Sequence, residues 1–182
     1  MTGIVEKNYS EALFHAILED CPEELERAMS ELEKIAEIIA ETPDFQKFCD
    51  APTVSAAEKF SVLGDAFAKT VSPYIYNFLR LLAEAGRMRN FGGILKNFKL
   101  LYNEHFNIAE ITVTSVFPLT EKQREEIAAK MAEITGKKIV LTAKTDGSLI
   151  GGIVIDYGNR RFDGSVRSRL EALRQSFSQL IG

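Results

Sequence analysis

The sequence predicts an α+β protein, with an N-terminal six-helix bundle followed by a small C-terminal module of mixed strands and helices. Two observations support this division. Apolar residues recur at helical spacing up to His105 and alternate as in strands after it. The charge changes at the same place, from a net −6 over residues 1–105 to +2 over residues 106–182. We therefore expect two domains, 1–106 and 107–182.

Start and stop signals divide the first part into short helices. Pro22 suits the first turn of a second helix, and Pro43 ends that helix because it forces the preceding residue out of the helical region. Ser55 and Glu58 have the spacing of a capping box, and Gly86 suits a helix C-terminus. The apolar residues between these signals step by three and four, which predicts a compact bundle.

The second part begins with a strand, a helix and another strand. Residues 108–117 alternate, which predicts a strand with Ile111, Val113 and Phe117 on one face. A helix with a capping box at its start follows, and then residues 137–144 alternate again.

Two tight turns are predicted beyond these elements. Asp146 and Gly147 form a strong hairpin signal, so the strand after them is expected to pair antiparallel with the strand before them. Gly158 and Asn159 tolerate positive φ and are expected to join a second hairpin, between IVIDY and RRF.

The glycine- and arginine-rich segment 149–174 lacks the spacing of a nucleotide site. No lysine follows its glycines as a P-loop requires, and no G-x-G-x-x-G occurs. A glycine pair inside a strand suits a bulge or the close approach of another backbone. A glycine before the last helix lets the chain turn into it, with Asp163 or Ser165 as the N-cap. Together with Asp146 in the preceding turn, the residues expected to shape this backbone are Gly151, Gly152, Gly158, Asp163, Gly164 and Ser165.

The last helix carries an apolar stripe with basic residues beside it. The stripe steps by four, three, four and three residues, which fits a coiled-coil seam as well as packing on the protein's own sheet. Arg167, Arg169 and Arg174 lie off the stripe, where they are either solvated or face an acidic helical partner. The stripe consists of Val166, Leu170, Leu173, Phe177 and Leu180.

No motif for catalysis, a metal or a cofactor occurs. His15 and His105 are the only histidines, and neither has Cys, Asp or Glu at metal-binding spacing. Nucleophile signatures are missing, and Cys21 and Cys49 are interpreted as reduced thiols. No apolar run is long enough to span a membrane. We therefore expect a binding protein without cofactors.

Charge weighs against nucleic acid as a partner. The net charge of −4 opposes a general nucleic-acid binder. Residues 19–41 hold nine acidic and two basic residues, which is typical of a solvated helix face or of an acidic docking surface. The alternative is an RNA-binding helical-bundle adaptor with a basic C-terminal arm, although the bundle is acidic and the arm has few aromatic residues for base stacking. An enzyme without a recognisable motif is a third interpretation.

Four stretches resemble the δ-subunit family of the F-type ATP synthase, which includes the mitochondrial oligomycin-sensitivity-conferring protein. The clearest is DGSLIGGIVIDYGNRRFDGSVRSRLEALR (146–174), in which Gly-Gly, a strand, a glycine turn and Asp-Gly-Ser follow in the family's order. The others are NFLRLLAEAGRM (77–88), YSEALF (9–14) and VTSVFPLTEKQ (113–123).

The resemblance implies a non-catalytic stator subunit of a hetero-oligomeric complex, peripheral on the cytoplasmic face of the bacterial cell membrane, without nucleic acid or direct membrane insertion. It implies that the bundle binds the amphipathic N-terminal helix of an α subunit between its first and fifth helices. It also implies that the C-terminal module binds the b subunits of the peripheral stalk, which couples rotation to ATP synthesis. The α-subunit contacts would be Tyr9, Ala12, Leu13, Asn77, Phe78, Leu81 and Leu82. The stalk contacts would be Val166, Arg167, Arg169, Leu170, Leu173 and Phe177.

Overall fold

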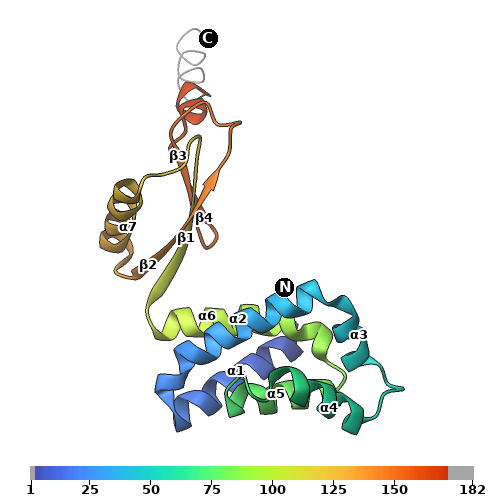
Figure 1. Cartoon of the computed structure of the whole chain (residues 1–182). Coiled ribbons are helices and arrows are strands. Elements are labelled where there is room, and N and C mark those ends of the chain that lie inside the picture. Colours follow the sequence, from blue (N-terminus) through green and yellow to red (C-terminus); the bar gives the residue numbers. More distant parts are fainter. Residues whose placement is uncertain (1–2, 172–182) are drawn as a thin grey trace. The chain divides into compact units, whose positions relative to one another are not determined.

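The computed structural model describes residues 3–171 and confirms the α+β class (Figure 1). The chain divides into two compact units, and the boundary lies between His105 and Phe106. The helical unit contains α1 (Ile4–Asp20), α2 (Leu25–Glu41), α3 (Pro43–Asp50), α4 (Ala56–Phe67), α5 (Pro73–Glu84) and α6 (Phe91–His105). The 3-10 turns η1 (Pro22–Glu24) and η2 (Met88–Asn90) precede α2 and α6.

The core of the helical unit is formed by apolar side chains from α1 to α6. α1 packs mainly against α6, and α4 packs against α5. Leu32 of α2, Leu79 of α5 and Phe98 of α6 are completely buried, and α2 contacts both α5 and α6. The three- and four-residue steps predicted from the sequence therefore mark inward faces.

Caps form at the start of α4 and at the end of α5, as the sequence predicts. The Ser55 hydroxyl accepts the Glu58 N–H at 3.3 Å, and the Glu58 carboxylate accepts the Ser55 N–H at 2.9 Å. Gly86 has a φ of +63°, and the N–H of Arg87 reaches back to the carbonyl of Leu82 at 2.9 Å. The positive φ explains why glycine stands at this helix end.

Two carboxylates tie distant segments of the helical unit together. Glu31 on α2 is buried and accepts the N–H of Ser72, just before α5, at 2.8 Å. Arg27 donates to the same carboxylate at 2.8 Å. Asp50 at the end of α3 accepts the N–H groups of Met88 and Arg89 at 2.8 and 3.0 Å. Both carboxylates satisfy backbone donors at the start of a helical segment.

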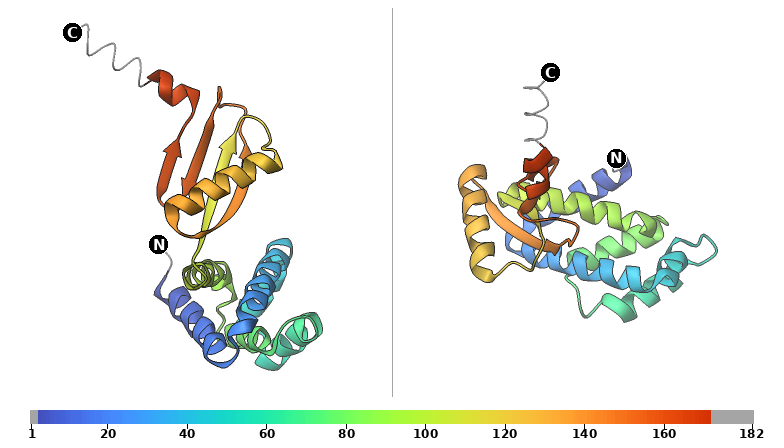
Figure 2. Two further views of the ribbon diagram at one scale, coloured as in Figure 1. Left: turned by 90° about the vertical axis from the view of Figure 1, so that its left-hand side faces the viewer. Right: turned by 90° about the horizontal axis from the view of Figure 1, so that it is seen from above.

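The second unit is a four-stranded sheet with α7 on one face (Figure 2). Its elements are β1 (Ile108–Ser115), α7 (Glu121–Thr135), β2 (Lys138–Thr145), β3 (Ile153–Tyr157) and β4 (Arg160–Asp163), and residues 166–171 are helical. Ile111 and Val113 of β1 and Met131 of α7 form the buried centre of this unit.

The sheet order β2-β1-β3-β4 shows that the hairpin predicted at Asp146 and Gly147 is wrong. β1 pairs parallel with β2 and antiparallel with β3, so the two strands that flank the turn lie on opposite sides of β1. The N–H of Asp146 bonds to the carbonyl of Ser115 at 2.9 Å, which ties the turn to the end of β1. Residues 146–152 then carry the chain past that end. The α7 crossover produces the parallel pair, because parallel strands require a long connection.

The predicted face of β1 is correct for Ile111 and Val113 but wrong for Phe117. The strand ends at Ser115, whose hydroxyl donates to the carbonyl of Phe117 at 2.7 Å. Phe117 therefore lies beyond the pleat and is 77% exposed.

Of the two roles predicted for the glycine pair, the close approach of another backbone is found at Gly152, although the pair precedes β3 and does not interrupt a strand. Gly152 has a φ of +82°, and a β-carbon added there would lie 2.4 Å from the carbonyl oxygen of Gly164. The N–H of Gly164 bonds to the carbonyl of Ile153 at 3.0 Å, and that of Val166 bonds to the carbonyl of Gly151 at 2.9 Å. Two backbone segments therefore meet at a distance that only glycine permits.

The second hairpin and the final cap also form as predicted. β3 and β4 pair antiparallel with Tyr157 opposite Arg160, and Gly158 in the turn has a φ of +55°. Of the two candidate caps, the Ser165 hydroxyl accepts the N–H of Ser168 at 3.2 Å. Asp163 instead accepts the N–H of Ser165 at 2.9 Å and shapes the approach to the helix.

We expect Gly152→Ala to destabilise the second unit by about 3 kcal/mol, because the left-handed backbone and the collision with Gly164 act together. Gly147→Ala is the matched control, since an added β-carbon there meets no atom within 4 Å. Hydrogen exchange of the β1 and β3 amides during a urea titration measures the difference. Equal protection in the two variants would contradict this account of the glycine.

Candidate functional site

An apolar groove runs between α1 and α5 on the helical unit. It encloses about 540 Å³. On each helix the lining residues step by three and four, so they share one face of that helix. The lining residues are Asn8, Tyr9, Ala12, Leu13, Ala16, Tyr74, Asn77, Phe78 and Leu81.

The groove is continuous with the core beneath it. The rings of Tyr9 and Phe78 meet edge to face, with 6.3 Å between their centres, and join the two helices. Leu13 and Phe78 are buried in the core and also line the groove. Leu81 is 49% exposed at its rim. A hollow with this lining suits an amphipathic helix that lays its apolar face into it.

The structure brings six of the seven predicted α-subunit contacts together in this groove, namely Tyr9, Ala12, Leu13, Asn77, Phe78 and Leu81. Their binding role stays a prediction. The prediction for Leu82 is wrong, because this residue is completely buried and does not line the groove. It follows Leu81 by one residue, which turns its side chain by about 100° around the helix and into the core.

The prediction missed three residues that line the groove: Asn8, Ala16 and Tyr74. Ala16 and Tyr74 each lie four residues from a predicted contact, so helical spacing could have found them. The same holds for Asn8, which lies four residues before Ala12.

Charged side chains lie at both ends of the groove. The Arg87 guanidinium lies 5.4 Å from the centre of the Tyr9 ring and donates to the Tyr9 hydroxyl at 3.2 Å. At the other end, the Tyr74 hydroxyl donates to Asp20 at 3.3 Å. Its interaction with Cys21, followed by desolvation and the charge of Asp20, raises the pKa of Tyr74 to about 12. The hydroxyl therefore keeps its proton at neutral pH.

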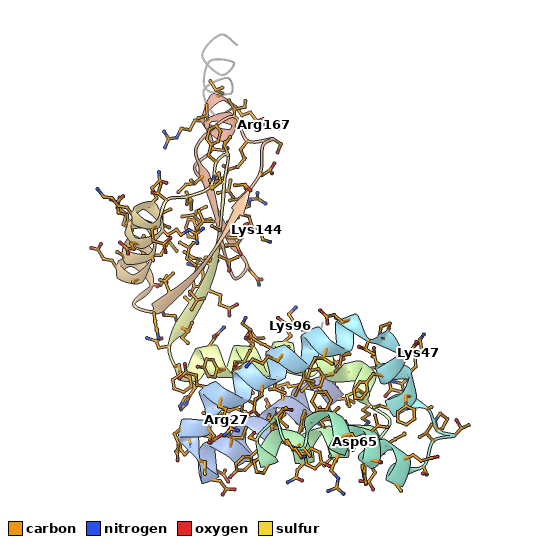
Figure 3. All side chains as sticks on the ribbon, viewed as in Figure 1. Arg27, Lys47, Asp65, Lys96, Lys144 and Arg167 are labelled. Atoms are coloured by element: carbon orange, nitrogen blue, oxygen red, sulfur yellow. The ribbon has the colours of Figure 1, made fainter. Side chains whose placement is uncertain are left out.

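The residues predicted at the stalk begin the last described helix. Val166 and Leu170 are 39% and 51% exposed. Arg167 and Arg169 are exposed as well, and Figure 3 shows the Arg167 side chain on this helix. The Nε of Arg167 lies 3.3 Å from Oε1 of Glu171, so the two side chains form an ion pair within the helix. Leu173 and Phe177 lie outside the described residues.

Hydrogen bonds hold the acidic residues of the predicted backbone signature in tight turns. Asp146 accepts the N–H of Ser148 at 2.8 Å, as Asp163 accepts that of Ser165. In each case the serine lowers the pKa of the carboxyl group, because the bond favours the charged form. These residues shape turns and do not form a pocket.

The groups that carry chemistry in enzymes are dispersed among the described residues. Within residues 3–171, no three His, Cys, Asp or Glu side chains lie together as a metal site would require. Burial is the largest cause that raises the pKa of Cys49 to about 11, so this thiol is not activated as a nucleophile. No helix between residues 3 and 171 is long and apolar enough to cross a membrane.

An apolar groove on the helical unit and exposed apolar side chains on the last helix of the second unit are typical of a protein that binds other chains. Over residues 5–177 the sequence matches the family described as ATP synthase delta (OSCP) subunit. The chain therefore belongs to this family, and it is a non-catalytic stator subunit of the F-type ATP synthase. The predicted family and function are confirmed, and the RNA-binding alternative has no support.

Similar proteins span nearly the whole chain. The ATP synthase subunit delta of Prochlorococcus marinus (strain MIT 9301) is 35% identical over 172 residues, which cover 94% of each chain. That of Brevibacillus brevis is 31% identical over 175 residues, 96% of this chain and 99% of the relative. A chain in the cryo-EM structure of the Toxoplasma gondii mitochondrial ATP synthase hexamer has the same fold, with a TM-score of 0.70, 24% identity and 99% of each chain covered.

We expect Leu82→Ala to lower the free energy of unfolding by about 2–5 kcal/mol, because it leaves a cavity in the core. Leu81→Ala, one residue earlier, should change it by less than about 1 kcal/mol, since its side chain is half exposed. Urea denaturation of both variants measures the contrast. Similar losses for the two would show that the division between core and groove is wrong.

Proposed function

We propose that the helical unit, a six-helix bundle formed by α1 to α6, binds the amphipathic N-terminal helix of an α subunit in the groove between α1 and α5. The observation that carries this proposal is the groove itself. Its lining is largely apolar, it extends over about two helical turns of α1 and α5, and it is open to a ligand. Leu81 leaves apolar surface at the rim that a bound helix would cover.

The second unit binds the b subunits of the peripheral stalk through its last helix. Val166 and Leu170 lie four residues apart and share an exposed apolar face. Arg167 and Arg169 flank that face, and residues 106–182 carry a net +2. An acidic helical partner with an apolar stripe complements this surface.

The two contacts together make the subunit a clamp. Proton flow turns a rotor, and the catalytic head would turn with it unless a stator held the head to the membrane sector. A chain that binds an α subunit with one unit and the b stalk with the other prevents this rotation. It does so on the cytoplasmic face of the bacterial cell membrane, within a hetero-oligomeric complex.

The energetics of one helix in one groove are compatible with this role. Each fully buried apolar side chain contributes about 1.5–3 kcal/mol, whereas association costs about 4–15 kcal/mol. A durable contact therefore needs several anchors in the groove. The other attachments of the stalk raise the effective concentration of the partners and strengthen the assembly.

We expect Leu81→Asp to weaken binding of a synthetic α-subunit N-terminal helix by about ten-fold or more, because it places a charge on the apolar rim. Titration calorimetry with the full chain measures the affinity. Leu81 suits this test better than Phe78, whose loss would also disturb the core.

Leu100→Asp is the matched control, since Leu100 on α6 is 59% exposed and does not line the groove. It should bind like the unmodified chain. Normal binding by a folded Leu81→Asp variant would remove the groove from the α-subunit contact.

We expect Leu170→Asp to abolish capture of the soluble part of the b subunits, because it breaks the apolar face of the last helix. Ile134→Asp on α7 is the control, as Ile134 is 73% exposed. Pull-down of b by each variant gives the comparison, with binding of the α-subunit helix retained in both. Full capture by Leu170→Asp would place the stalk contact elsewhere.

A further inference from the structure

The sequence Asp-Gly-Ser occurs twice in the chain, at residues 146–148 and 163–165, and both copies lie in the second unit. Their local chemistry is alike. Each aspartate accepts the N–H of the serine in its own copy, at 2.8 Å in the first and 2.9 Å in the second. The serine lowers the pKa of both carboxyl groups, because the bond favours the charged form. A difference in reactivity between the copies therefore depends on the backbone around the glycine.

An aspartate that precedes glycine can react with its own backbone. The glycine nitrogen attacks the side-chain carboxyl carbon and a C–N bond forms. The hydroxyl of the protonated carboxyl group then leaves as water, together with the proton of that nitrogen. A second water opens the resulting succinimide ring at either carbonyl, which gives aspartate or isoaspartate. In isoaspartate the main chain runs through the former side chain and is longer by one methylene. Glycine favours the attack because no side chain restricts its backbone.

The backbone around Gly147 is free to take up the geometry of this attack. Residues 144–148 are all exposed, and a β-carbon added at Gly147 would meet no atom within 4 Å. The N–H of Gly147 donates to no acceptor among residues 3–171. The carbonyl of the same peptide unit, that of Asp146, accepts the N–H of Leu149 at 3.3 Å, which is long for a backbone hydrogen bond.

The backbone around Gly164 is held on both sides. Its N–H donates to the carbonyl of Ile153 at 3.0 Å. Its carbonyl oxygen lies so close to Gly152 that a β-carbon added there would be 2.4 Å away. Asp163 ends β4 and is paired with Val154 in β3. The nitrogen of Gly164 can therefore turn toward the carboxyl group of Asp163 only after this end of the sheet has opened.

We propose that Asp146 is a site of spontaneous isomerisation to isoaspartate, and that the fold protects the same sequence at Asp163. The added methylene falls where the chain leaves β2, in the turn whose first N–H is bonded to Ser115. Residues 146–152 lead from there to the backbone contact at Gly152, beside which the last helix begins. Isomerisation therefore disturbs the connection that positions this helix.

Incubation of the folded full chain for weeks at neutral pH tests the proposal. Trypsin cuts after lysine and arginine, so it releases the two copies on separate peptides, 145–160 and 162–167. Isoaspartate leaves the mass of a peptide unchanged but shifts its retention in liquid chromatography, and fragmentation in the mass spectrometer locates it. Isoaspartate should form at Asp146 about ten-fold or more faster than at Asp163, because the hydrogen bond and contacts of Gly164 have to open first.

The same chain unfolded in urea is the control for the sequence, and there the two sites should isomerise at similar rates. Gly147→Ala is the matched variant in the folded chain. It should slow the reaction at Asp146 by about ten-fold, because a side chain restricts the backbone, while the added β-carbon meets no atom within 4 Å. Equal rates at the two sites of the folded chain overturn the protection of Asp163. Failure of the folded chain to form isoaspartate at Asp146 overturns the proposal altogether.

Discussion

The groove depends on α1 being apolar on two faces at once. One face of α1 packs into the bundle. In an ordinary amphipathic helix, the rest of the surface would carry polar residues. Here the neighbouring face is apolar too, and α5 supplies the opposite wall. Because Leu13 and Phe78 belong to both the core and the groove, the stability of the bundle keeps the groove in shape. The inward residues of α1 are Leu13, Phe14 and Ile17, and those of the groove are Asn8, Tyr9, Ala12, Leu13 and Ala16.

A different constraint shapes the second unit. Gly152 and Gly164 let two backbone segments touch, and the hydrogen bonds on either side of this contact fix where the last helix begins. Ser165 then caps that helix, on which Val166 and Leu170 are exposed. The glycine- and arginine-rich segment 149–174, whose composition suggested a nucleotide site, therefore determines where the last helix begins.

Signals between near neighbours in the sequence predicted the helix ends well. Features that depend on distant residues, such as strand pairing, could not be predicted from them. Ser55 and Gly86 determine helix ends through bonds to near neighbours, so their roles can be deduced from spacing. The turn at Asp146 has the residues of a hairpin, but β3 pairs with the other edge of β1 and not with β2. Leu82 shares its chemistry with Leu81, and only the rotation of α5 within the bundle decides which of them faces the groove.

Apolar surface and charge make separate contributions to the groove. Exposed apolar side chains such as Leu81 are unfavourable in free solution, and covering them supplies the free energy of binding without specifying how the ligand is oriented. The charged side chains have a different role, because Arg87 contacts Tyr9 at one end of the groove and Asp20 accepts a hydrogen bond from Tyr74 at the other. These contacts hold two of the rings that line the groove. In the proposed clamp, the apolar surface would keep the catalytic head attached under torque, while the contacts at the two ends keep the walls of the groove in place.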